Sequence, residues 1–115
     1  MPNWFGAPVM VLETVGRRSG KARATPILYL RDGDRLVVQA ANAGNKSTPA
    51  WWLNLRAAGE GSVVIAEERH RVRPRIPDGE ERERLRQEYA HMYPAAEEYR
   101  EFTEREIPLI VLEPA

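Results

Sequence analysis

Short apolar stretches alternate with polar, glycine-containing segments along the first part of the chain. Residues 9–15, 25–30 and 35–41 are rich in apolar and β-branched side chains, which favour strands. Two glycines bracket the polar segment after the first stretch, and the turn at 32–34 carries the Asp-Gly signal of a tight hairpin. The pattern predicts three antiparallel strands joined by two successive hairpins.

A change of period predicts a helix after the third strand. Residues 49–58 lose the alternation, and Trp52 and Leu55 stand at helical spacing. Pro49 suits the first helical position, and Ser47 or Thr48 can cap the helix before it. We therefore expect one short helix after a long polar loop.

Residues 62–66 and 69–76 predict another hairpin, around two glutamates. The second arm alternates strictly, which places His70, Val72 and Ile76 on one side and four arginines on the other. We take the arginine side as solvated and the opposite side as the inner face of the sheet.

A highly charged helix is predicted after this hairpin. Asp78 with Glu81 three residues later resembles a capping box, and the helix ends near Pro94. Its apolar stripe has the helical spacing i, i+4, i+7 and consists of Leu85, Tyr89 and Met92. A second short helix over 95–103 and a strand over 107–113 complete the chain.

These elements describe an α+β domain whose antiparallel sheet curls into a small barrel. A chain of 115 residues has room for one core only. Prolines and a glycine make residues 1–8 an irregular lead-in. We expect residues 9–115 to form the single domain.

Composition excludes several classes of protein. The chain has no cysteine and only 2 histidines, which stand far apart, so we expect no disulfide and no metal site. Its apolar runs are much shorter than the roughly 20 residues that span a bilayer, so we expect no integral membrane segment and no signal peptide. The formal net charge is +0, which argues against a protein that coats nucleic acid.

Positive charge is nevertheless concentrated in the first hairpin loop. Arg17, Arg18, Lys21 and Arg23 stand close together around Gly20. Glycines let a backbone approach a ligand, and cations with hydroxyls supply the charge-assisted donors that a phosphate requires. The spacing does not match a Walker loop. A solvated hairpin turn explains these residues about as well, and nucleic-acid backbone binding is a third reading.

Aromatic residues supply two more candidate surfaces. Adjacent side chains on a helix point about 100° apart, so Trp51 and Trp52 cannot share a face. One is expected in the core, and the other beside polar groups such as Asn54, as a wall for a flat ligand. Tyr93 and Tyr99 can both fall on one side of a turn. For each pair, packing in the core is the alternative explanation.

Four motifs, in order, resemble the deazaflavin-dependent nitroreductase family, which includes F420H2-dependent quinone reductases. They are Gly-Arg-Arg-Ser-Gly at 16–20 with the residues up to Pro26, the turn at 32–34, the Trp-Trp segment at 49–55 and Arg-Glu-Ile-Pro at 105–108. The resemblance covers residues 9–114. It implies a split β-barrel, similar to FMN-binding proteins, and coenzyme F420, a deazaflavin with a phosphate-linked polyglutamate tail.

The resemblance also implies a role for each matching position. Residues of the basic loop would contact the phosphate and the tail: Arg17, Arg18, Ser19 and Arg23. Further residues would lie along the linker and the deazaflavin ring: Thr25, Pro26, Ala41, Asn42, Trp51 and Asn54. Tyr93 and Tyr99 would face the acceptor as the catalytic candidates, and no residue would bind a metal.

The reaction that the resemblance implies is hydride transfer from reduced F420 to a small quinone-like or other electron-poor conjugated acceptor. Ala41 and Ala96 stand where members of the family carry a serine and an aromatic residue, which favours a compact quinone over a bulky nitroimidazole. An FMN-dependent reductase of the same barrel and a non-catalytic flavin carrier are the alternatives. We expect a cytoplasmic monomer or homodimer without a nucleic-acid partner, with room for peripheral contact with the inner face of the membrane.

Overall fold

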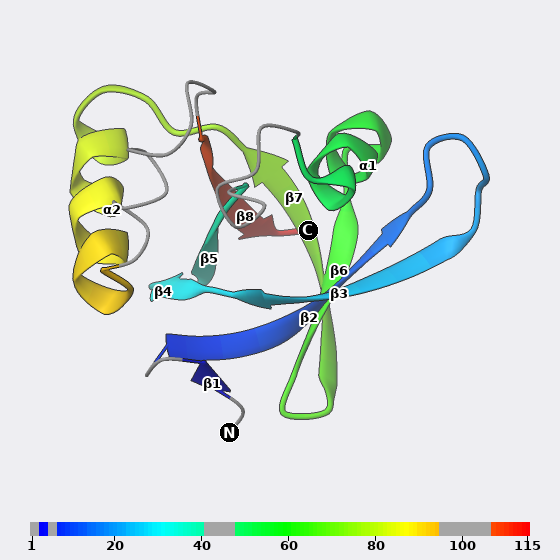
Figure 1. The fold of residues 1–115 in the computed structure, drawn as a ribbon, viewed down its shortest axis with the longest axis horizontal. Coiled ribbons are helices and arrows are strands. Elements are labelled where there is room, and N and C mark those ends of the chain that lie inside the picture. Colours follow the sequence, from blue (N-terminus) through cyan, green and yellow to red (C-terminus); the bar gives the residue numbers. More distant parts are fainter. Residues whose placement is uncertain (1–2, 5–6, 41–47, 95–106) are drawn as a thin grey trace.

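The computed structural model describes residues 3–4, 7–40, 48–94 and 107–115 (Figure 1). Its strands are β1 (Asn3–Trp4), β2 (Ala7–Val15), β3 (Ala22–Leu28), β4 (Leu30–Asp32), β5 (Arg35–Gln39), β6 (Gly61–Ile65), β7 (Glu68–Arg75) and β8 (Leu109–Pro114). The described helices are α1 (Ala50–Ala58) and α2 (Gly79–Met92), and neither is long and apolar enough to cross a membrane. The pairing is antiparallel in the order β1-β2-β6-β7-β8-β5-β4, with β3 on β2. The predicted α+β split barrel is confirmed.

The strand that leaves the basic loop changes its partner halfway along. β3 pairs with β2 over its whole length, whereas β4, which follows Tyr29, pairs with β5. The sequence predicts one strand over 25–30, whereas the structure divides this segment. The Tyr29 N–H makes the last bond toward β2, to the Pro8 carbonyl at 3.1 Å, and the residues of β4 then pair with β5. Among the described strands, β3 therefore has no neighbour on the side away from β2.

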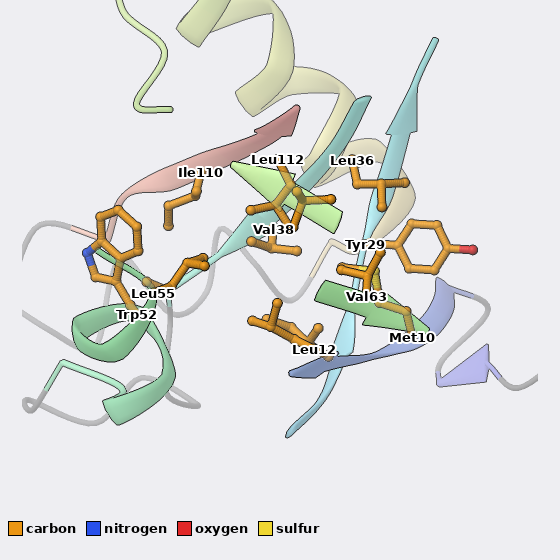
Figure 2. Close-up of a cluster of buried hydrophobic side chains, with 13 residues drawn as sticks. Met10, Leu12, Tyr29, Leu36, Val38, Trp52, Leu55, Val63, Ile110 and Leu112 are labelled. Atoms are coloured by element: carbon orange, nitrogen blue, oxygen red, sulfur yellow. The ribbon is translucent and has the colours of Figure 1, made fainter. Parts of the chain in front are cut away.

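The main core fills the barrel between the sheet and α1 (Figure 2). Alternate residues of β2 point inward, so Met10 and Leu12 are buried while Val11 between them is 37% exposed. Figure 2 shows Trp52 and Leu55 of α1 at one end of this cluster and Tyr29 at the other. The helical spacing of the tryptophan and the leucine thus predicted the buried face of α1 correctly.

The structure modifies the expected start of α1. Pro49 is the N-cap residue rather than the first helical residue, and no side chain caps the helix. Its carbonyl instead accepts the N–H of Trp52 at 3.2 Å. Thr48 is therefore not the cap, and Ser47 lies outside the described residues.

The lead-in and the 62–76 hairpin also depart from expectation. Residues 1–8 are not wholly irregular, because β1 pairs with the start of β2. His70 and Ile76 do not face inward: the His70 side chain is 55% exposed and Ile76 is 52% exposed, which leaves Val72 as the buried residue of that arm. Ala66 and Glu67 form the two-residue turn between β6 and β7, both with positive φ.

A second apolar cluster joins α2 to the barrel on the side opposite the basic hairpin loop (Figure 1). Leu85 and Tyr89 are buried against Val37 and Val111, and Met92 packs on the edge of the cluster. The predicted apolar stripe is confirmed. The remaining surface of α2 is strongly charged, so this narrow stripe alone provides its hydrophobic attachment.

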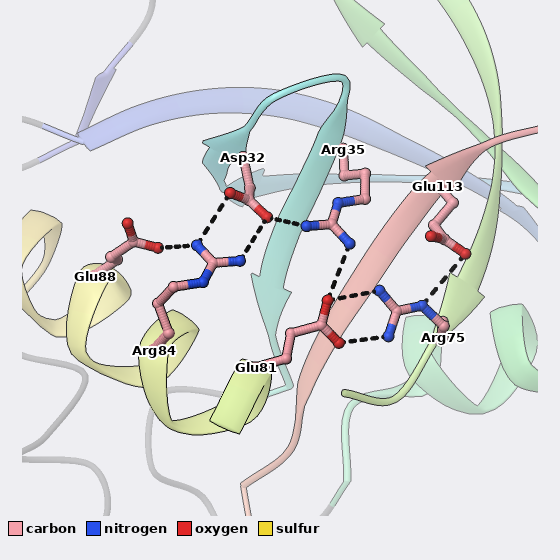
Figure 3. A network of polar contacts seen from close by, with 7 residues as sticks. All are labelled: Asp32, Arg35, Arg75, Glu81, Arg84, Glu88 and Glu113. Atoms are coloured by element: carbon pink, nitrogen blue, oxygen red, sulfur yellow. Dashed lines mark hydrogen bonds and ion pairs between the residues drawn. The ribbon is translucent and has the colours of Figure 1, made fainter. Parts of the chain in front are cut away.

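Ion pairs supply the rest of the attachment of α2 (Figure 3). The Glu81 carboxylate accepts Arg75 Nη1 at 2.6 Å and Arg35 Nη1 at 3.0 Å, while Arg84 donates to Asp32 at 3.2 Å. Glu81 therefore links α2 to β7 and β5 and does not complete a capping box; Asp78 is the N-cap residue but makes no side-chain cap bond. Arg75, expected in solvent, lies partly buried in this network.

The network lowers the pKa of its acids. Hydrogen bonds from Arg75, and then from Arg35, lower the pKa of Glu81 from its ordinary value of 4.5 to about 2. Hydrogen bonds from Arg84, and then from Arg35, lower the pKa of Asp32 as well. A carboxyl group with a lowered pKa stabilises the fold above its unfolded pKa, and this contribution is lost as the pH falls through the folded pKa.

We therefore expect the thermal stability to fall between pH 4.5 and pH 2 as Glu81 gains a proton. Glu81→Gln should lower the melting temperature at neutral pH and flatten this part of the profile, as measured by circular dichroism. Glu60→Gln is the control, because Glu60 pairs with the exposed Arg71 away from α2. An unchanged pH profile in the Glu81 variant would contradict the assignment.

Candidate functional site

A cavity of about 590 Å³ lies between the β2–β3 hairpin loop, β3 and the first turn of α1. In Figure 1 this hairpin extends beyond the barrel on the side of α1. The cavity is lined by Thr14, Gly16, Arg17, Arg18, Ser19, Ala22, Arg23, Ala24, Thr25, Ala50, Trp51 and Asn54. Among the described residues, no carboxylate lines it, and the charged side chains in its lining are arginines.

Backbone hydrogen bonds fix the shape of the loop. The Gly16 N–H donates to the Lys21 carbonyl, and the Gly20 N–H donates to the Gly16 carbonyl, each at 2.8 Å. Gly20 has a φ of 70°, which a glycine adopts without strain. A Cβ on Gly16 would lie 2.5 Å from Ser19 Oγ, so a larger residue there would displace the serine. The backbone conformation of Gly20 thus favours glycine, whereas a side chain at Gly16 would require Ser19 to move.

Asn54 connects this loop to α1. Its Oδ1 accepts the backbone N–H of Arg17 at 3.1 Å and Arg17 Nη1 at 2.9 Å. Asn54 is only 6% exposed, so it is a buried amide whose oxygen is committed to the loop. The sequence predicts Asn54 beside a ligand ring; in the structure Asn54 lines the cavity and orients the first arginine of the loop.

Several described arginines pair with carboxylates, and the cations of the cavity do not. Within the described ranges, Arg18 and Arg23 make no ion pair, and Arg17 bonds only to the Asn54 amide. In contrast, other arginines are paired with carboxylates: Arg35, Arg69, Arg71, Arg75, Arg84 and Arg86. Charge that is not neutralised by the protein is available to an anionic ligand.

Thr14 adds a buried hydroxyl to the lining. It is 5% exposed, and its Oγ1 has no hydrogen-bond partner within the described part of the chain. Buried polar groups nearly always have a partner, because an unpaired one is costly. A polar ligand that enters the cavity could supply the missing bond.

α1 contributes a ring and a helix end. Trp51 is half-buried, lines the cavity and packs partly against the core, while Trp52 is 6% exposed inside it. Their ring centroids lie 6.4 Å apart at 61°. Ala50, the first residue of α1, also lines the cavity, and the first turn holds no acidic residue. The positive end of the helix therefore adds to the charge of the arginines.

Most of the predicted cofactor residues that the structure describes line this cavity. They are Arg17, Arg18, Ser19, Arg23, Thr25, Trp51 and Asn54. Pro26 is exposed on β3 and is not among the lining residues. Ala41, Asn42 and Tyr99 lie outside the described residues. Tyr93 is 7% exposed in the second cluster, with α2, and does not line the cavity.

Several lining residues have no role predicted from the sequence. Thr14 was read as part of an apolar strand, although a hydroxyl at an inward-facing position next to the basic loop was a usable signal. Ala22, Ala24 and Ala50 carry no functional side chain, so nothing in the sequence marked them. Their contribution follows from the position of their backbones.

Comparison with known proteins yields one family. The family model for F420H(2)-dependent quinone reductase matches residues 2–114. Rv3178 of Mycobacterium tuberculosis, provisionally named an F420H(2)-dependent quinone reductase, is 33% identical over 107 residues, which cover 93% of this chain and 90% of that protein.

Solved structures agree with the family match. The structure of F420-H2 dependent reductase FDR-A has a TM-score of 0.82 and 29% identity, and covers 92% of this chain and 94% of its own. A structure described as a domain-swapped dimer has a TM-score of 0.83 and 29% identity, over 92% of this chain and 80% of its own.

The two tryptophans should respond differently to substitution. Trp51→Ala should impair binding of a ring-containing ligand in the cavity with a modest loss of stability, because its ring is only partly in the core. Trp52→Ala should cost about 3–5 kcal/mol, the usual cost of truncating a buried aromatic residue. Denaturant unfolding and ligand titration measure the two effects. Equal losses of stability with unchanged affinity would show that both rings serve packing alone.

Proposed function

Because this chain belongs to the F420H(2)-dependent quinone reductase family, we propose that its basic cavity holds coenzyme F420 and that the chain reduces a quinone-like acceptor. The chain is an F420H2-dependent reductase, and F420 is its cofactor. The proposal adds the location of the cofactor, the residues that hold it and the class of acceptor.

One observation carries the location: within the part of the chain that the structure describes, arginines without carboxylate partners line a cavity that no acid lines. F420 combines a phosphate with a polyglutamate tail, so it carries several negative charges. Hydrogen bonds between ions are about twice as strong as neutral ones, and guanidinium groups suit both phosphate and carboxylate. The orphaned hydroxyl of Thr14 offers a further polar contact inside the same cavity.

Each element of the cavity has a separate task in this proposal. The Asn54 amide holds Arg17 in place before the cofactor arrives, so less conformational freedom is lost on binding. Arg18 and Arg23 bind the anionic groups, with Ser19 and Thr25 beside them. Trp51 forms the wall against the deazaflavin ring, and we assign Ala41 and Asn42, which follow β5 in the sequence, to the ring as well.

When bound, reduced F420 supplies a hydride to an electron-poor conjugated acceptor, and the protein holds the two flat molecules together without water. We assign the hydroxyl on the acceptor side to Tyr99. Tyr93 is buried with Leu85 and Tyr89, so we assign it to the attachment of α2 rather than to the reaction. A small quinone remains the favoured acceptor.

The alternatives are an FMN-dependent reductase and a flavin carrier without activity. FMN has one phosphate and no acidic tail, so it would leave part of the positive charge of the cavity unused. The likeness to a domain-swapped dimer supports a homodimer as the oligomeric state, with the monomer as the alternative. We propose a cytoplasmic location with peripheral membrane contact, where quinones are held.

Removal of two cavity charges should affect F420 more than FMN. The double variant Arg18→Ala/Arg23→Ala should weaken F420 roughly 100-fold or more, since a hydrogen bond to a charged group contributes about 1.5–3 kcal/mol. The loss for FMN should be much smaller. Tryptophan fluorescence titration at low and high salt measures both affinities, and the binding of F420 should weaken with salt because screening acts over about 8 Å at physiological ionic strength.

Arg69→Ala/Arg71→Ala is the matched control, because it removes the same charge from exposed pairs on β7. This variant should bind both cofactors as the original chain does. Equal losses for F420 and FMN in the cavity variant would contradict the assignment of the tail to this site.

The acceptor and the two tyrosines are tested in one kinetic series. Stopped-flow mixing of the enzyme with reduced F420 and a small quinone should show rapid oxidation, and a bulky nitroimidazole should react slowly. Tyr99→Phe should lower turnover with nearly unchanged cofactor affinity, whereas Tyr93→Phe should leave turnover unchanged. If no quinone oxidises the bound cofactor, the carrier alternative replaces the enzyme.

A further inference from the structure

We infer that the free edge of β3 binds an extended, acidic amide chain by main-chain hydrogen bonds, and that this chain is the oligoglutamyl tail of the cofactor. The inference rests on the proposed function, which places F420 in this cavity. It adds a binding element made of backbone, which no side-chain comparison would reveal.

The register of the hairpin determines which backbone groups of β3 are free. Gly16 donates to Lys21 at one end of the pair, and Tyr29 donates to Pro8 at the other. Hydrogen-bonded and non-hydrogen-bonded pairs alternate along antiparallel strands. The pairs Val15↔Ala22, Glu13↔Ala24 and Val11↔Pro26 are therefore all of the non-hydrogen-bonded kind.

It follows that the N–H and C=O groups of Ala22 and Ala24, and the C=O group of Pro26, point away from β2. No described strand pairs with β3 on that side. Ala22 and Ala24 are exposed and line the cavity, although their side chains offer only a methyl group. Pro26 has no N–H, and a proline is tolerated at a position of a strand where no neighbouring strand requires that donor.

The free edge of β3 presents backbone N–H donors and C=O acceptors in alternation. A ligand that fits this edge must therefore carry both acceptors and donors. A phosphate offers acceptors only, so it would meet the free carbonyls unfavourably. An amide chain offers both an N–H and a C=O for each unit, as strands that add to a sheet edge do. The nearby Arg18 and Arg23 then require that the chain carry carboxylates, and each glutamyl unit has one.

The spacing also fits. Equivalent groups of Ala22 and Ala24 are two residues apart, or about 6.6 Å along an extended strand. One γ-linked glutamyl unit spans five main-chain bonds, or about 6 Å when extended. Because five is an odd number of bonds, successive amides of a fully extended γ-linked chain point to opposite sides, as they do in an α-linked peptide. Alternate amides therefore face the edge about 12 Å apart, which is close to the roughly 13 Å between Ala22 and Pro26 along an extended strand.

Ala24→Pro tests the inference, because it removes one free N–H without breaking a bond to β2. Ala24→Val is the matched control, since it adds similar bulk and keeps the N–H. We would titrate both variants and the original chain with F420 that carries several glutamyl units, with F420 that lacks them, and with free tetra-γ-glutamate. Thermal unfolding verifies that the variants are folded.

The proline variant should bind the tailed cofactor and free tetra-γ-glutamate about 5–10-fold more weakly, the effect of one hydrogen bond. Its affinity for the tail-less cofactor should change less than about 2-fold. The valine variant keeps the N–H but adds bulk to the cavity lining, so it should change the affinities for the tailed and tail-less cofactors by the same factor. If the proline variant loses the same affinity for the tailed and the tail-less cofactor, or loses none for either, the inference is overturned.

Titration with free tetra-γ-glutamate, beside the two forms of F420, separates a failure of this inference from a failure of the proposed function. If tetra-γ-glutamate binds and is weakened by Ala24→Pro, but neither form of F420 binds, the edge site stands and the proposed function fails. If Ala24→Pro does not fold, amide hydrogen exchange of Ala22 and Ala24 in the original chain decides the matter. Both amides should become protected when tetra-γ-glutamate is added, and unchanged exchange would overturn the inference.

Discussion

At Tyr29 the strand that leaves the basic loop stops pairing with β2, and the chain turns to pair with β5. The residue is held from two sides: its N–H donates to the Pro8 carbonyl, and its buried ring lies beneath the guanidinium of Arg31. This change of partner lets the sheet curl into a barrel. It also leaves one side of β3 without a strand among the described residues, and the cavity forms along that side, with α1 as its opposite wall.

Arginines serve two purposes in this small domain. On the side of α2 they are matched with acids, and the matched pairs attach a helix that has few apolar residues of its own. At the hairpin loop they are left without acids, within the described residues, and are organised by a buried amide instead. The overall charge of +0 conceals this division.

The sequence was most informative where periodicity or turn chemistry is local. The Asp-Gly turn, the buried face of α1 and the stripe on α2 all follow from spacing, and the basic loop followed from its composition. The change of partner at Tyr29 depends on contacts between distant segments, so no local pattern announces it. Glu81 likewise matches a capping pattern, but its carboxylate binds Arg75 of β7 and Arg35 of β5 instead of the start of its own helix. The alanines whose backbones line the cavity could not be predicted, because their side chains carry no functional group.

The turn between β6 and β7 has a consequence for engineering. Ala66 and Glu67 both adopt positive φ, at 50° and 69°, although neither is a residue type that favours this region. Left-handed backbone costs an ordinary residue roughly 1–2 kcal/mol, whereas Asn-Gly adopts such a turn readily. Replacing Ala66 and Glu67 by Asn-Gly should therefore stabilise the hairpin, at a turn that does not line the cavity. The added free energy of unfolding would offset the destabilisation caused by substitutions at the basic loop that change its ligand specificity.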